Sequence, residues 1–500
     1  MGYTIRWPDL VVLTVGFIAM IFIGSICARR NKSAETYFLA GRNMNGWVVG
    51  FSMMATVISS MSFLANPGSA YAGNWKFMTP TAGYFIALIM ALFLFMPYYR
   101  KVKISSAYEY LEIRFGAWAR FYAAAGFILM QIFRIGIILY AASLAIQAMT
   151  NWPMPFVILL FGIIVAIYTV AGGLEAVIWT DVIQAIALIG GAFICLPIVI
   201  KHLPGGFGQI ISMGMEDNKF SLGDTTWDLS QREFWTLLFM SPLFWIQIMC
   251  TDQSMVQRYC APKTLKEARK SMLFGAALTV PMWTYFFFIG TAIYVFYKIN
   301  PTADLQNLEG PEQILPFFIL RQVPSGLAGF VILGLVASAM STLDSLVNAT
   351  AATLTNDFYK RLISKKNSDN HYLKMGRIFS VLFSLIMIIT AMTIHWTRTQ
   401  TLNDIQTLAF SIFGGGLLGL FMLGFLTKSV SSKTALISTI TTVLCVCLFL
   451  AIQSSAGEKL CPSISSKMPD GVWLGTLANI FIFVLGIILT KLFNRKKTHK

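Results

Sequence analysis

Residues 338–350 have the sequence SAMSTLDSLVNAT and interrupt a stretch that is otherwise as apolar as a membrane-spanning helix. Within it, Ser341, Ser345 and Asn348 recur at intervals of three and four residues and therefore share one helical face, with Asp344 beside them. An ionised aspartate in hydrocarbon costs at least ~2.5 to 3.5 kcal/mol. This face must therefore turn toward protein, water or an ion.

Two roles fit the polar side chains of this segment. Ser338 and Thr342 are typical of residues that form hydrogen bonds between closely packed membrane helices, and we expect that role for them. Ser341, Asp344 and Ser345 offer two hydroxyls and a carboxylate. Together with backbone carbonyls freed at a helix break, these groups supply the oxygen ligands that a hard monovalent cation needs. We therefore expect a cation site here.

The composition shows that the whole chain is built for a membrane. Of its 500 residues, 56% are hydrophobic and 12% are charged, and the mean hydropathy is +0.68, outside the range of soluble proteins. We predict an all-α polytopic membrane protein. At roughly 20 residues per span, thirteen apolar segments qualify as membrane spans. They lie near residues 9–27, 47–71, 79–99, 119–149, 155–171, 177–200, 233–250, 271–297, 326–353, 375–396, 404–427, 434–452 and 471–490.

The net charge of +16 has a simpler explanation than a nucleic-acid partner. When successive loops are assigned to alternate sides of the membrane, most Lys and Arg residues fall on one side, including the clusters at residues 29–32, 100–103, 360–366 and 494–500. By the positive-inside rule, that side faces the cytoplasm. With an odd number of spans, the N-terminus is then expected outside and the C-terminus in the cytoplasm.

Two more charged residues lie within predicted spans. Asp181, in GGLEAVIWTDVIQ, shares a face with Gln184 early in the sixth span. It is either an acid near the water boundary or a ligand. Arg134, in QIFRIGIILYAASLAI, is the only basic residue deep within a predicted span. It requires either an acidic protein partner or an anionic ligand.

Prolines suggest how the spans are arranged. Pro67 and Gly68 stand late in the second span, and Pro242 stands early in the seventh. We interpret both spans as broken helices. Five spans separate them, and a repeat of an odd number of spans inserts its second copy upside down. Paired broken helices in two inverted halves are typical of the binding site of secondary transporters.

Several motifs resemble, in the same order, those of the sodium:solute symporter family. The family has the inverted-repeat fold of the leucine transporter. The resemblance implies one transporter domain over residues 1–500, with an extra helix at 9–27, inverted five-helix repeats at 47–201 and 233–427, and two C-terminal helices at 434–493. The motifs are YFLAGRNMNGWVVGFSMMATVISSMSF, KISSAYEYLEIRFG, GGLEAVIWTDVIQ, TDQSMVQRY, STLDSLVNATAATLTNDFYKR and FGGGLLGLFMLG.

The resemblance also implies which residues bind sodium. Carbonyls at the break of the second span, here Ala55 and Ile58, join hydroxyls of the ninth span. The matching residues in that span are Ser341, Asp344 and Ser345. Many relatives have Ser or Thr where this chain has Asp344, so the carboxylate either tightens sodium binding or makes the site sensitive to protons. The site is expected to bind sodium as the coupling ion, with no other cofactor.

A second sodium and the substrate are implied by the same resemblance. Asp181 matches the acid that holds a second sodium beside Ser341 and Ser345 in the sialic acid branch. Arg134 matches the arginine that binds the carboxylate of the sugar acid there. Two features depart from that branch: Val57 replaces a hydroxyl residue, and the segment around Thr81 lacks an expected Gln. The expected substrate-binding residues are Ser59, Ser62, Thr81, Arg134, Phe244 and Gln247.

The expected function is sodium-coupled import of a small organic solute by alternating access, with a carboxylated sugar such as sialic acid as the first candidate. A neutral sugar or another small organic acid stays open as the substrate. A channel would need a continuous polar pore. An enzyme or a receptor would need a catalytic constellation or a soluble domain, for which the loops near 201–232 and 298–325 are too short. We expect a non-enzymatic monomer in the bacterial plasma membrane, whose partners are its substrate, sodium and lipid.

Overall fold

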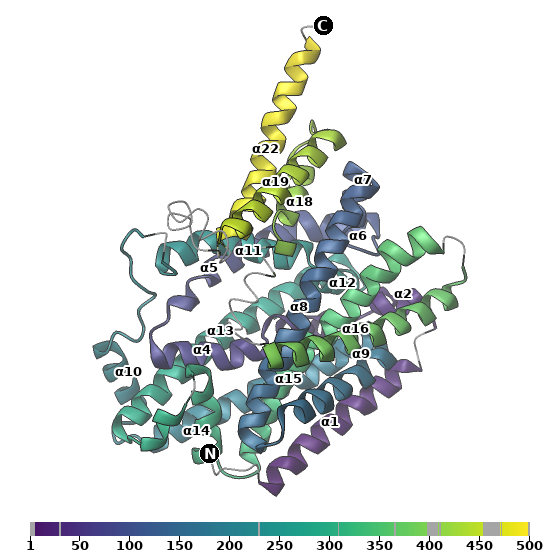
Figure 1. Cartoon of the computed structure of the whole chain (residues 1–500). Helices are drawn as coiled ribbons and strands as arrows, with labels where there is room; N and C mark the ends of the chain where they lie inside the picture. The colour runs from purple at the N-terminus through teal and green to yellow at the C-terminus, as the bar shows by residue number, and fades with distance from the viewer. Residues whose placement is uncertain are drawn as a thin grey trace.

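The computed structural model describes residues 6–29, 32–228, 231–308, 310–364, 367–397, 409, 412–453, 471 and 473–498. Within these ranges every regular element is helical, as predicted (Figure 1). The long helices are α1 (Trp7–Ala28), α8 (Ala117–Thr150), α9 (Met154–Lys201), α11 (Phe234–Thr251), α13 (Leu265–Ile299), α15 (Leu327–Thr353), α16 (Asp369–Thr397), α19 (Ser432–Gln453) and α22 (Trp473–Thr498). The shorter ones include α2 (Ala34–Leu39), α3 (Gly46–Val57), α4 (Ser60–Ala72), α5 (Thr81–Met90), α6 (Met96–Val102), α7 (Glu109–Phe115), α10 (Gly206–Glu216), α12 (Gln253–Cys260), α14 (Ile314–Gln322) and α18 (Leu417–Leu426).

The expected count of thirteen spans stays a prediction. Among the described residues, ten helices are long and apolar enough to cross a membrane, or eleven if α3 and α4 form one bent span. The spans predicted at 155–171 and 177–200 both lie in α9, where two helical segments meet at a kink at Gly173 (φ 59°, ψ −160°). The span predicted at 404–427 is described over the ten residues of α18, and most of its first part lies outside the described residues.

Helix α15, which contains the polar segment, lies at the centre of the molecule. The most apolar window of the span Leu327–Ile363 is 94% buried, whereas the corresponding window of α1 is 22% buried. Helix α15 packs against α9 above all, and also against α8, α1 and α16 (Figure 1). The predicted inward direction of its polar face is therefore confirmed.

The second predicted span is broken, but not where its proline suggested. Helix α3 ends at Val57, and α4 begins at Ser60 after extended backbone at Ile58 (φ −90°, ψ 97°). The two helices are bent by 51°. Pro67 lies inside α4 instead, so the expected break at Pro67 and Gly68 was wrong.

The seventh predicted span also differs from expectation, because Pro242 lies inside the continuous helix α11. Both prolines face a glycine of a neighbouring helix. A Cβ atom on Gly290 would lie 2.2 Å from the Pro67 carbonyl oxygen, and one on Gly83 would lie 2.5 Å from the Pro242 nitrogen. These prolines therefore mark close helix crossings. The chain bends instead after α11, at Asp252, before α12 begins.

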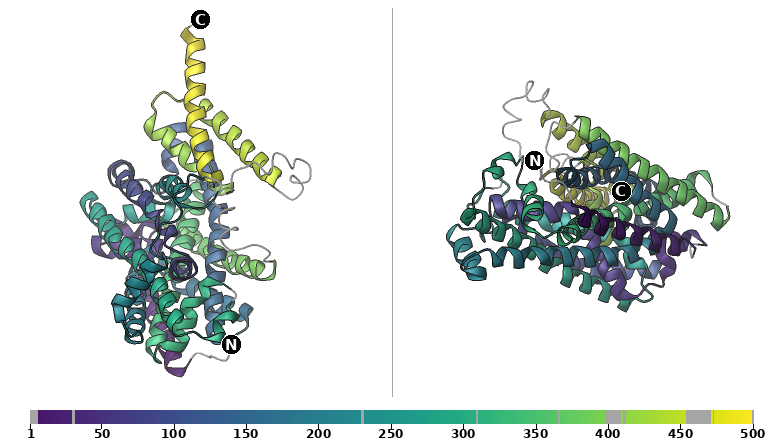
Figure 2. Two further views of the ribbon diagram at one scale, coloured as in Figure 1. Left: turned by 90° about the vertical axis from the view of Figure 1, so that its left-hand side faces the viewer. Right: turned by 90° about the horizontal axis from the view of Figure 1, so that it is seen from below.

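The C-terminal helices form a separate group beside the central bundle. Helix α22 packs against α18 and α19, and this group contacts the bundle mainly through α11 and α7. The left view of Figure 2 shows α22, in yellow, extending away from the other helices. The two helices predicted at 434–493 correspond to α19 and α22. The predicted boundaries of the two repeats stay a prediction.

Candidate functional site

The centre of the site is the contact between the α3–α4 break and α15. The hydroxyl of Ser341 donates to the Ala55 carbonyl oxygen at 2.9 Å, and both residues are buried. Ile58, the residue at the break itself, is fully buried. The Ser345 hydroxyl lies 3.4 Å from that of Thr56. The structure therefore brings the residues predicted for the first sodium to one place, where α15 faces the loosened backbone.

Asp344 is completely buried beside these oxygens. Its Oδ2 accepts a hydrogen bond from the Tyr168 hydroxyl of α9 at 3.0 Å. Its Oδ1 accepts one from the Ser345 hydroxyl at 3.3 Å. Two neutral hydroxyls thus solvate this carboxylate, and Tyr168 was not identified from the sequence, because nothing in its apolar segment distinguishes it.

Asp181, also completely buried, lies on the other side of Ser345. Its Oδ2 accepts from the Ser52 hydroxyl at 2.5 Å and from Nη2 of Arg258 at 3.0 Å. Its Oδ1 has no hydrogen-bond partner in the described part of the chain. The Asp181 carboxylate is thus enclosed by protein. The unpartnered, buried oxygen fits a cation ligand.

Arg258 joins the two halves of this cluster. Its Nη2 also donates to the Ser345 hydroxyl at 2.6 Å, and its Nε donates to the Ser52 hydroxyl at 2.8 Å. The side chain is 0% exposed, compared with 16% for Arg134, so Arg134 is not the only deeply buried basic residue. Sequence reasoning missed Arg258 because its motif TDQSMVQRY follows a span and resembles a loop. In the structure that motif forms α12, whose eight residues are all buried.

The charges of the buried cluster do not balance. Asp181 and Asp344 bring two carboxylates, and Arg258 brings one guanidinium, so the cluster has one net negative charge when both acids are ionised. All three side chains are fully buried. Unpaired buried charge is strongly unfavourable. The arrangement is therefore suited to accept a small monovalent cation.

Arg134 has the acidic protein partner that was one of its two expected roles. Its Nη1 lies 3.5 Å from Oδ2 of Asp252, which also accepts from the Gln131 side chain at 3.2 Å. The other oxygen of Asp252 caps the N-terminus of α12 through Ser254 at 2.8 Å. Asp252 thus lies at the start of α12, and Arg258 lies in its last turn. Helix α12 connects the surroundings of Arg134 with the buried cluster.

The remaining predicted substrate residues divide into two groups. Ser62 and Thr81 line a cavity of about 150 Å³ together with Trp245 and Trp283. Ser59 immediately precedes α4 at the break. Phe244 and Gln247 do not line this cavity, and their expected place in the substrate-binding wall stays a prediction. Phe244 is 40% exposed, and Gln247 accepts a hydrogen bond from Asn479 of α22 at 3.2 Å.

The reason for this division is the orientation of α11. Trp245, the neighbour of Phe244, faces the cavity, while Gln247 faces the C-terminal helices. A helix turns by about 100° per residue. Adjacent residues therefore point in different directions, and the sequence alone does not show which face meets the cavity.

Comparison with known proteins agrees with this architecture. The sequence model of the sodium:solute symporter family matches residues 37–442. The sodium/sialic acid symporter SiaT of Proteus mirabilis is 32% identical over 434 residues, which are 86% of this chain and 86% of that protein. The sodium/sialic acid symporter NanT of Aliivibrio fischeri is 30% identical over 426 residues, 85% of this chain and 84% of that protein.

Solved structures show the same fold. The substrate-bound, outward-open structure of a Na+-coupled sialic acid symporter superposes with a TM-score of 0.87 at 29% identity, over 97% of this chain and 98% of that one. The nucleobase-cation-symport-1 family transporter Mhp1 superposes with a TM-score of 0.60 at 17% identity, over 92% of this chain and 95% of that one. At that identity the second likeness concerns the fold alone.

Proposed function

Because this chain belongs to the sodium:solute symporter family, whose members are transporters and not enzymes, we propose that it imports a carboxylated sugar of the sialic acid class together with sodium. The relatives named sodium/sialic acid symporters support this substrate class. The observation that carries the proposal is the contact of Ser341 with the Ala55 carbonyl at the α3–α4 break. A broken helix opposite a hydroxyl-rich helix is the arrangement in which such transporters bind ions and substrate.

The first sodium is proposed to bind Ala55, Ile58, Ser341, Asp344 and Ser345. Two pairs of these oxygens are already in contact: the Ser341 hydroxyl with the Ala55 carbonyl, and the Ser345 hydroxyl with the Asp344 carboxylate. Sodium prefers such hard oxygen ligands. Ser345 is central, because its hydroxyl contacts both Asp344 and Arg258.

The second sodium is proposed to bind Asp181, Ser341 and Ser345. In the structure, Nη2 of Arg258 contacts both Asp181 and Ser345. The guanidinium therefore contacts two of the three residues that are proposed to bind this ion. We infer that the second sodium binds only when Arg258 gives up its contact with Ser345. The unpartnered Oδ1 of Asp181 supports a ligand role that leaves the Arg258 contact at Oδ2 in place.

The substrate is proposed to contact Ser59, Ser62, Thr81 and Arg134. The contact between Nη1 of Arg134 and Oδ2 of Asp252 is long, at 3.5 Å. A substrate carboxylate that binds the guanidinium in the bidentate manner would form a stronger pair. The same contact supports an alternative, since an Arg134 that stays paired with Asp252 leaves room for a neutral sugar.

Coupling between substrate and sodium is proposed to pass through α12. Asp252, which precedes α12, contacts Arg134, and this contact is proposed to break when Arg134 binds the substrate. Arg258, six residues later, contacts Asp181 and Ser345. A substrate that draws Arg134 away from Asp252 would free this helix to move. Arg258 would then move with it, and the second sodium could bind.

We also propose the orientation of the transporter, its membrane and its oligomeric state. The clusters of Lys and Arg place the C-terminus in the cytoplasm and the N-terminus outside. The relatives from Proteus mirabilis and Aliivibrio fischeri support a bacterial plasma membrane. We propose that the monomer is the transporting unit, because the ion cluster and the substrate residues all come from one chain.

The deciding experiment is uptake of labelled sialic acid into proteoliposomes that contain the purified chain. Accumulation above the external concentration that requires an inward sodium gradient is the expected result. If a neutral sugar competes with sialic acid and is taken up at a higher rate, the alternative substrate is favoured. Equilibration without uphill accumulation would indicate a channel, and binding without uptake would indicate a receptor. Either of these two results would overturn the proposal.

A further inference from the structure

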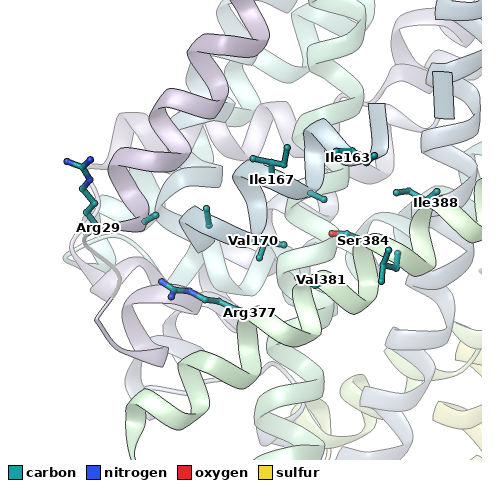
Figure 3. A pocket seen from close by; sticks show the side chains of 12 residues that line it. Arg29, Ile163, Ile167, Val170, Arg377, Val381, Ser384 and Ile388 are labelled. Atoms are coloured by element: carbon teal, nitrogen blue, oxygen red, sulfur yellow. The ribbon is translucent and has the colours of Figure 1, made fainter. Parts of the chain in front are cut away.

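A second site lies on the outside of the bundle, in a cavity between α1, α9 and α16. It has a volume of about 700 Å³ and is lined almost entirely by apolar side chains, with Arg29 and Arg377 as its charged members. Figure 3 shows both arginines at one end of this cavity and Ile163 and Ile388 toward the other. The cavity is thus amphipathic, with its positive charge confined to one end.

The apolar walls face away from the protein interior. Ile163, Ile167 and Leu385, which line the cavity, are 49%, 49% and 53% exposed. Helices α1 and α16 both pack against α9, and the cavity lies between them. The exposed apolar side chains are therefore in position to meet lipid chains, not a soluble substrate.

The dimensions of the cavity match one leaflet of a bilayer. From Arg377 to Ile388 the chain advances eleven residues along α16, which is about 16 Å at a rise of ~1.5 Å per residue. The hydrocarbon core of a bilayer is ~30 Å thick. The apolar part of the cavity thus spans about half the core and ends at the arginines, where a lipid phosphate would lie.

The charge at the polar end is available for an anion. Among the described residues, neither Arg29 nor Arg377 forms an ion pair, and the buried Nε of Arg377 has no hydrogen-bond partner. This end is also the one that the distribution of Lys and Arg assigns to the cytoplasm. Basic pockets between membrane helices on that side are suited to anionic lipid headgroups, and guanidinium groups bind phosphate in a bidentate manner.

We propose that this cavity binds an anionic phospholipid, with its phosphate between Arg29 and Arg377 and one acyl chain along α9 and α16 toward Ile163 and Ile388. A zwitterionic lipid would bring a second positive charge close to two arginines and is expected to bind less well. A free phosphate would use the arginines but not the apolar walls. The proposal does not depend on which solute the protein transports.

Native mass spectrometry of the purified full-length chain tests the proposal. The protein is taken from vesicles of phosphatidylcholine mixed with phosphatidylglycerol, and retained lipid is counted. The wild type is expected to retain phosphatidylglycerol in preference, and the double variant Arg29→Gln/Arg377→Gln to retain ~10-fold less, because it loses charged hydrogen bonds to phosphate. The matched control is Lys266→Gln/Lys270→Gln, which removes the same charge on the same side at exposed positions of α13.

A second variant separates lipid from phosphate. Leu385→Trp keeps both arginines but fills the apolar groove, and it is expected to lower phosphatidylglycerol retention by a similar factor. Sodium-induced thermal stabilisation of each variant shows that it is folded. Equal retention by the wild type and the arginine variant, or equal loss in the lysine control, would overturn the proposal. It would also fail if excess inorganic phosphate displaced the lipid while Leu385→Trp retained it normally.

Discussion

Nη2 of Arg258 lies 3.0 Å from Oδ2 of Asp181, and both side chains are completely buried. This ion pair stands within the cluster that is proposed to bind sodium, because the same nitrogen contacts the Ser345 hydroxyl. The protein thus holds a cation of its own where a transported cation would bind.

Removal of Arg258 should destabilise the protein and strengthen its response to sodium. Arg258→Met leaves Asp181 buried without its partner, which typically costs ~3–5 kcal/mol. The variant should therefore unfold at lower temperature in choline, but should gain more thermal stability from sodium than the wild type. Arg258→Met/Asp181→Asn is the control, and it should recover most of the lost stability. If the single and double variants unfold alike, the ion pair contributes nothing measurable.

The hydroxyls and carboxylate of α15 should control sodium activation. Ser341→Ala, Asp344→Ala and Ser345→Ala each remove one oxygen from a small ion with few alternative ligands, so each should raise the sodium concentration for half-maximal uptake. Ser338→Ala and Thr342→Ala are matched controls. In the described part of the chain their hydroxyls donate to carbonyls of their own helix, at 2.6 Å and 3.2 Å, so the bonds between helices that were expected for them are not found. A wild-type sodium dependence in all three test variants would leave the segment with a packing role only.

The role of Asp344 should be resolved by replacement with serine. If its carboxylate only tightens the site, Asp344→Ser remains a sodium-driven carrier with weaker sodium affinity and an unchanged pH profile. Tyr168→Phe removes the hydroxyl that donates to Asp344 at 3.0 Å and should shift sodium affinity in the same direction. A pH dependence of uptake that disappears in Asp344→Ser, with sodium affinity retained, would instead show that the acid exchanges protons.

Arg134 should be essential for an acidic substrate. Arg134→Ala should abolish sialic acid uptake, and Arg134→Lys should be nearly as inactive, because a point charge cannot form the bidentate pair with a carboxylate. Asp252→Asn should keep or increase substrate affinity, since it removes the competing acid. Sodium-induced thermal stabilisation must persist in each variant, which distinguishes a binding role from a structural one. Wild-type affinity in both Arg134 variants would exclude this assignment.

The stoichiometry follows from the energy of transport. One sodium supplies ~2.3 kcal/mol from 100 mV and ~1.4 kcal/mol from a tenfold gradient. Entry of a monoanion costs ~2.3 kcal/mol, so one sodium leaves about 1.4 kcal/mol, or roughly tenfold accumulation. A second sodium raises the limit to about several thousandfold.

We therefore expect electrogenic uptake with two sodium ions per anion. Asp181→Asn should lower the Hill coefficient for sodium toward one, as measured from initial uptake rates at fixed potential. Ser338→Ala serves again as the folded control. A wild-type Hill coefficient of one, found with a neutral sugar as the best substrate, would contradict both this stoichiometry and the assignment of Arg134.

Local sequence was sufficient to predict properties that depend on helical periodicity and on the free energy of transferring a side chain into lipid. Ser341 and Ser345 recur along α15 at a spacing that places them on one face, and Asp344 is too costly to expose to lipid. The inward direction of this face followed from these two facts, and the structure confirms it. The contact between Ser341 and Ala55 was reached only through the family resemblance, because the residues are 286 positions apart in the chain.

Composition and helical periodicity identified a helical membrane protein and its helices with polar faces, and the motifs identified the family that it resembles. Tertiary structure decided the rest. The prolines at 67 and 242 indicated breaks, but both lie inside helices, where a glycine of a neighbouring helix packs closely against each of them. Arg258 resembled a loop residue, yet α12 folds into the interior and places it beside Asp181. Helical periodicity and hydropathy are local properties of the sequence. The partner of a buried charge depends instead on which helices pack against each other in the folded chain.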